Sequence, residues 1–161
     1  MKKQSWVTDL FDCYDTNMEE LGAIREWQGR RYMWVLFDSG TAEDTASKGD
    51  SLGFVSSGFT GYTVTTDVSD CIADWLAGCI QNQTGVNVPT DGQYFWMQIS
   101  GPIVLSQTVE DSAAAADGIG LGASADGACG KATTLKPCGG VLINATALAA
   151  ILDCMPFTYS P

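Results

Sequence analysis

The chain has 161 residues, a formal net charge of −11 from 19 acidic and 8 basic side chains, and no histidine. This length suits one domain, which buries roughly 70% of the surface of its unfolded chain. The acidic balance argues against nucleic acid as a partner, because phosphate binding needs a concentrated basic surface. The lack of histidine removes the usual general base and the commonest metal ligand, so we expect no enzyme, no metal and no cofactor.

The first residues contain no apolar core of the kind a signal peptide needs, and no segment approaches the ~20 apolar residues of a membrane span. We therefore expect synthesis in a cytoplasm and no membrane partner. Residues 1–30 differ from the rest and predict an extended N-terminal arm ahead of a β-rich domain, residues 31–161. The arm carries four aromatic side chains among acids and amides: Trp6, Phe11, Tyr14 and Trp27.

A short helix is expected within the arm, because Thr16-Asn17-Met18-Glu19 matches a capping box and the pattern continues to about Arg25. Aromatic side chains on a terminal segment often dock on another surface. The arm is therefore expected to reach a partner, with packing back onto its own domain as the alternative.

The next segments favour strands. Residues 31–38, RYMWVLFD, are rich in aromatic and branched residues. Residues 51–56 and 61–66 predict a hairpin about Ser57-Gly58, with its threonines facing solvent. Residues 69–80 predict a helix instead, because apolar side chains recur at offsets 0, 3, 4, 7 and 8. Those side chains are Ile72, Trp75, Leu76, Cys79 and Ile80.

The stretch 91–108, DGQYFWMQISGPIVLSQT, is expected to organise the fold as two strands that meet at a corner at Gly101-Pro102. Side chains of a strand alternate between its faces, so Tyr94, Trp96 and Gln98 should share one face and Phe95, Met97 and Ile99 the other. Both faces are largely apolar. Such a strand is covered on both sides, by the domain's own core and by a second layer or another subunit.

The last third begins with a low-complexity stretch, residues 110–130, in which an alanine run lies between Asp-Gly turns. Residues 128–134 and 138–143 predict two further strands around Lys136-Pro137. Residues 144–152 predict a final short helix. The sequence thus predicts a mainly β fold, a single β-barrel or β-sandwich domain with one or two short helices.

The chain has six cysteines, and no two of them form a Cys-x-x-Cys pair. Together with the absence of histidine, this spacing argues against a zinc site. Most are expected to be small buried side chains, and Cys129 with Cys138 is the best candidate disulfide if one forms. Neighbouring carboxylates such as Glu43-Asp44 are expected to be solvated. The Asp-Gly turns lack the alternating ligands of a calcium loop.

Three groups of residues then follow one another in a suggestive order. They are Lys48, Gly49 and Asp50; Tyr94, Trp96, Gln98, Gly101 and Pro102; and Gly118, Leu121, Gly122, Asp126 and Gly127. Over about residues 31 to 143 this order resembles the small β-barrel or β-sandwich decoration proteins, or head cement proteins, of tailed bacteriophages. The four cysteines at 71, 79, 129 and 138 and the helix expected over 69–80 depart from the simplest members.

The resemblance implies a non-enzymatic virion protein on the outer surface of the capsid, made in the host cytoplasm. Its partners would be the major capsid protein and itself, as a homotrimer or homodimer, and it would stabilise the shell by bridging capsomers. The expected interface residues are Trp6, Phe11, Tyr14, Trp27, Tyr94 and Trp96. One alternative is a carbohydrate or host-surface binding module of a virion that stacks sugars on Tyr62, Tyr94 and Trp96. A secreted, disulfide-stabilised β domain is another.

Overall fold

The computed structural model describes residues 6–40, 46–57, 61–106, 120–131, 140–144 and 149–154. These ranges contain strands and no helix. The strands are β1 (Cys13–Tyr14), β2 (Ile24–Trp27), β3 (Arg30–Phe37), β4 (Ser51–Val55), β5 (Thr63–Thr65), β6 (Cys71–Cys79), β7 (Tyr94–Val104), β8 (Gly120–Ala125), β9 (Ala128–Lys131), β10 (Gly140–Asn144) and β11 (Ala149–Asp153).

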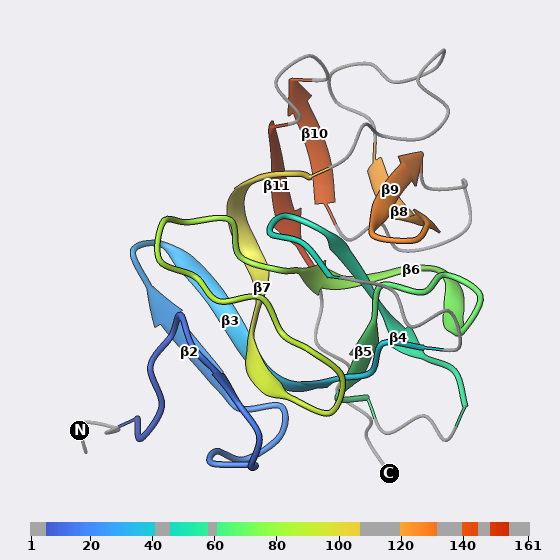
Figure 1. The fold of residues 1–161 in the computed structure, drawn as a ribbon. Coiled ribbons are helices and arrows are strands. Elements are labelled where there is room, and N and C mark those ends of the chain that lie inside the picture. Colours follow the sequence, from blue (N-terminus) through green and yellow to red (C-terminus); the bar gives the residue numbers. More distant parts are fainter. Residues whose placement is uncertain are drawn as a thin grey trace, which may run out of the picture.

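All the strands belong to one mixed sheet, in which β3 and β5 pair in parallel and the other pairs are antiparallel. Pairings join β3 to β5, β5 to β4, β4 to β6, β6 to β7 and β7 back to β3, so five strands form a closed circuit. In Figure 1, β7 extends from beside β3 to β11, beyond which lie β10, β8 and β9. The expectation of a mainly β fold is confirmed.

Strand β7 alternates as expected. Phe95, Met97 and Ile99 belong to the main core, which also holds Val35 and Leu52. On the opposite face, Trp96 is fully buried and Tyr94 packs beside it. The prediction that two strands meet at Gly101-Pro102 is wrong, because β7 is one strand that continues to Val104. Gly101 has a φ of +95° and lies where pairing with β3 ends and pairing with β11 begins, which allows one strand to serve both.

The expected helix over 69–80 is wrong, because these residues form β6. Residues 76–80 are all buried, so both faces of the strand are covered and the period-two alternation disappears from the sequence. Register shifts against β4 add to this irregularity. The strand leaves no room for a side chain at Gly78, because a Cβ there would lie 2.6 Å from the carbonyl oxygen of Gln98.

The two other expected helices are also wrong in the described residues. Glu19 does not cap a helix at Thr16, because its carboxylate accepts hydrogen bonds from Val7 and Thr8. The segment over 144–152 ends in β11, whose residues alternate between buried and exposed. The threonine face of β5 is not exposed to solvent either, since Thr65 is completely buried.

The remaining expectations are confirmed where the structure describes them. Antiparallel β4 and β5 form the expected pair, β9 falls within the strand expected over 128–134, and β10 overlaps the strand expected over 138–143. The intervening Lys136-Pro137 and residues 110–119 lie outside the described residues.

Candidate functional site

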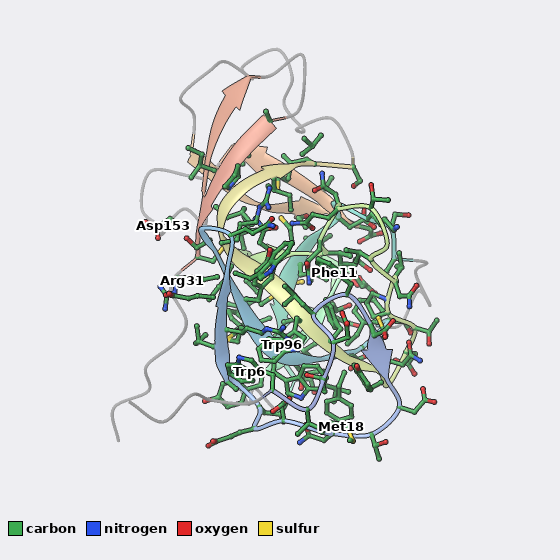
Figure 2. The ribbon with its side chains drawn as sticks, turned by 90° about the vertical axis from the view of Figure 1, so that its left-hand side faces the viewer. Trp6, Phe11, Met18, Arg31, Trp96 and Asp153 are labelled. Carbon is green, nitrogen blue, oxygen red and sulfur yellow. The ribbon has the colours of Figure 1, made fainter. Side chains whose placement is uncertain are left out.

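The six aromatic residues expected at an interface gather in one cluster on the second face of β3 and β7. We call this cluster the aromatic layer. Its buried members are Leu10, Tyr32, Trp34 and Trp96, and packed against them are Trp6, Phe11, Tyr14, Leu21, Ala23, Trp27 and Tyr94. Figure 2 shows Trp6 beside Trp96, with their ring centroids 5.0 Å apart in an edge-to-face contact. The arm thus supplies the second layer that β7 requires.

Hydrogen bonds fix the arm on this layer. The indole N–H of Trp96 donates to Thr8 Oγ1 at 2.9 Å, and the Thr8 hydroxyl donates to Glu19 Oε1 at 2.9 Å. The same carboxylate oxygen accepts from the backbone N–H of Val7 at 2.8 Å. A second indole, that of Trp34, donates to Asn17 Oδ1 at 2.8 Å. The buried indole donors of Trp34 and Trp96 therefore both find their acceptors on the arm.

Arg25 connects the arm to the sheet. Its guanidinium lies 5.9 Å from the ring centroid of Trp6 and 5.8 Å from that of Trp96, and it donates to the carbonyl oxygen of Thr8 at 3.1 Å. A guanidinium stacked on two indoles and bonded to the backbone holds the arm in place. Arg25 is therefore occupied within the chain.

This arrangement changes what the expected interface residues can do. Trp96 is fully buried, so it cannot touch a partner or stack on a sugar while the arm is in place. Tyr62 packs over Gly22 and is not a member of the aromatic layer. Trp6, Phe11, Tyr14, Trp27 and Tyr94 are partly exposed, and a contact of theirs with a capsid stays a prediction.

A different surface exposes apolar side chains. Pro102 and Val104 of β7 and Ile151 of β11 point outward, and Pro102 is paired directly with Ile151. Val104 and Ile151 are 48% and 49% exposed. We call these three side chains the β7–β11 face. Three neighbouring apolar side chains in water, on a chain with few apolar side chains exposed among its described residues, suit a contact surface.

A hollow of ≈ 320 Å³ lies at the turn between β2 and β3. The residues that line it are Glu26, Trp27, Gln28, Gly29, Arg30, Arg31 and Ser100. It contains two of the chain's eight basic residues. In Figure 2 Arg31 and Asp153 lie at the same edge of the molecule, as expected from the pairing of both residues with Ser100. No periodic pattern in the sequence predicts this hollow, because a turn and a bulge create it.

Cys13, Cys71, Cys79 and Cys129 are free thiols, and the last three are buried, as expected for small apolar side chains. Cys129 is among them and Cys138 lies outside the described residues, so their disulfide stays a prediction. Cys79 lies close to Cys129, which no sequence pattern predicted. A hydrogen bond between these two thiols, followed by burial, raises the pKa of Cys79, which therefore stays protonated. Burial and then the nearby Asp12 raise the pKa of Cys13 to about 11.

In the part of the chain that the structure describes, no three His, Cys, Asp or Glu side chains converge as metal ligands would. None of its described segments is a helix long and apolar enough to span a membrane. Comparison with protein-family models, with curated proteins and with solved structures found no match to this chain.

Proposed function

We propose that this chain is a non-enzymatic virion protein that binds the outer surface of a tailed-phage capsid and stabilises it by bridging capsomers. The observation that carries the proposal is the β7–β11 face, formed by Pro102, Val104 and Ile151. These side chains stand on paired strands of a sheet, so they are held in place before a partner arrives. The partner on this face is the major capsid protein.

The mechanism is interface area. A standard protein interface buries ~1,600 Å², more than three side chains supply, so attachment also uses residues around the β7–β11 face. A homotrimer or homodimer presents two or three such faces at once. Effective concentration then makes attachment tighter than each single contact. The closed circuit of pairings through β3, β5, β4, β6 and β7 favours the barrel version of the fold and gives this face a stiff support.

The net charge of −11 is consistent with a position outside the shell, away from packaged nucleic acid. The repulsion between an acidic protein and DNA extends over about one Debye length, ~8–10 Å at physiological salt.

The test is co-sedimentation of the purified protein with expanded phage heads that lack it, counting copies bound per head. Ile151→Glu places a charge in the β7–β11 face and should lower the affinity at least about tenfold. Ile151 is half exposed, so this variant is expected to fold. Met18→Glu is the matched control, because Met18 is 46% exposed on the arm.

Saturation at a copy number that matches the symmetry of the shell supports the proposal and fixes the oligomer. No binding of the unaltered protein to any head form contradicts it. Equal loss in Ile151→Glu and Met18→Glu would remove the β7–β11 face from the mechanism.

The second candidate is a carbohydrate or host-surface binding module of a virion. The hollow at the β2–β3 turn favours it, because it joins Trp27 to a group of polar side chains. The platform expected from Tyr62, Tyr94 and Trp96 does not support this function, since Trp96 is buried. A glycan screen that gives saturable binding would support this candidate.

A further inference from the structure

The hollow at the β2–β3 turn combines an apolar ring with hydrogen-bonding groups of both kinds. Trp27 lines it, Glu26 offers acceptors, and Arg31 and Gln28 offer donors. Each hydroxyl of a sugar both donates and accepts, so a pair of adjacent hydroxyls matches a carboxylate beside a guanidinium. The volume of ≈ 320 Å³ is at the lower end of that of small-molecule sites.

The indole N–H of Trp27 differs from those of Trp34 and Trp96 in its hydrogen bonding. The indole N–H groups of Trp34 and Trp96 donate to arm residues, whereas that of Trp27 has no partner among the described residues. Phe11 supports the Trp27 ring in an edge-to-face contact, with centroids 5.2 Å apart and planes at 82°. The indole is thus held by a neighbour, and its donor is not used by any described residue.

The charged groups at the hollow are also available. Arg31 Nε lies 3.7 Å from Glu26 Oε1, longer than a hydrogen bond, and the two side chains are 44% and 77% exposed. Arg30 is different, because its Nε donates to the carbonyl oxygen of Pro102 at 3.1 Å. Arg30 therefore secures the rim, while Arg31 and Glu26 can exchange their loose contact for a ligand. The carboxylates of Glu26 and Asp153 near Arg31 disfavour an anionic ligand.

The backbone around the hollow is constrained. Gln28 and Gly29 form the turn with φ values of +48° and +74°. On the other side, a Cβ at Gly101 would lie 2.9 Å from Arg30 Cγ and 3.2 Å from the carbonyl oxygen of Gly29. The β7 backbone thus packs directly on the turn. A site built this way loses little conformational freedom when a ligand binds.

We propose that this hollow binds a single pyranose ring of a glycan. Trp27 contacts the apolar face of the ring, and Glu26 and Arg31 hydrogen-bond to two adjacent hydroxyls. This inference rests on the second candidate function and names its ligand class. Binding of one ring is weak, with a dissociation constant on the order of 1 mM, and attachment to a surface depends on several copies.

The test is a titration of the full chain, followed by NMR at the indole N–H signals. The probes are the methyl glycosides of glucose, mannose, galactose and N-acetylglucosamine. At least one should shift the Trp27 signal saturably. Glu26→Ala should weaken that binding at least about tenfold, because the acceptor is lost. Glu20→Ala is the matched control, since Glu20 is an exposed glutamate of the same segment that does not line the hollow.

Three results overturn the inference. The first is no shift with any probe at about 50 mM, roughly 50 times the expected dissociation constant. The second is binding that both Glu26→Ala and Arg31→Ala leave unchanged. The third is an equal shift of Trp27 with sodium acetate, which would identify an anion site. Co-sedimentation with heads is measured without any sugar, so failure here leaves the capsid proposal standing.

Discussion

The contact that joins the arm to the sheet can be tested with Thr8→Val. Valine has nearly the shape of threonine but lacks the hydroxyl, which links the indole N–H of Trp96 to the carboxylate of Glu19. Thr8 is 4% exposed and Trp96 is completely buried, so water cannot replace the lost partner without opening the layer.

The expected cost follows from these contacts. An unpaired buried donor costs about 1–3 kcal/mol, and a hydrogen bond to a charged acceptor contributes at least about 1.5 kcal/mol. The added methyl group recovers about 0.8 kcal/mol through burial. The net loss in free energy of unfolding should be about 2–4 kcal/mol, a large part of the roughly 5–15 kcal/mol of a typical domain.

The assay is urea unfolding followed by tryptophan fluorescence, which reports on this layer because Trp6, Trp34 and Trp96 belong to it. With a denaturant slope of about 2–3 kcal/mol per molar, the midpoint should fall by roughly 1 M. Thr16→Val is the control, since Thr16 is an exposed threonine of the same arm. A loss below about 0.5 kcal/mol in Thr8→Val would refute the view that this hydrogen-bond chain holds the arm.

Two further predictions concern the main sheet. Gly78→Ala should destabilise the fold by about 1–3 kcal/mol, because the new Cβ would lie 2.6 Å from the carbonyl oxygen of Gln98; an unchanged urea midpoint would contradict this. Burial raises the pKa of Asp50 above its ordinary 3.8, although hydrogen bonds from Ser106 and Ser47 oppose the shift. The folded state thus binds this proton more tightly, which favours folding at low pH and is lost as pH rises through the folded pKa. The free energy of unfolding of the unaltered protein relative to Asp50→Asn should therefore fall as the pH rises above the ordinary pKa of 3.8, and a rise would contradict the assignment.

The strands that the sequence predicted well are those with a simple pattern. The strand over 31–38 and the alternation of Phe95 with Trp96 follow from runs of aromatic and aliphatic residues, whose alternate side chains enter two different apolar clusters. β6 was mistaken for a helix because burial on both faces removes the alternation that marks a strand. Its apolar residues then match a helical stripe by chance.

The helix expected within the arm was wrong for a different reason. Thr16 and Glu19 have the spacing of a capping box, but Glu19 bonds to residues eleven and twelve positions away. Local spacing cannot reveal such a contact, because it exists only once the chain folds back. The surfaces proposed here were likewise hidden, since Ile151 and Pro102 meet only through strand pairing and the hollow needs Ser100 beside the β2–β3 turn.

The place of β7 in the sheet has a consequence for synthesis in the cell. β1 and β3 both pair with β7, which leaves the ribosome much later than they do. At about 5–20 residues per second, the roughly 60 residues between β3 and β7 take about 3–12 s to make. During that time Trp6, Phe11 and Trp34 have no completed layer to enter. The nascent chain therefore presents an aromatic surface to chaperones and to neighbouring nascent chains until Trp96 has emerged.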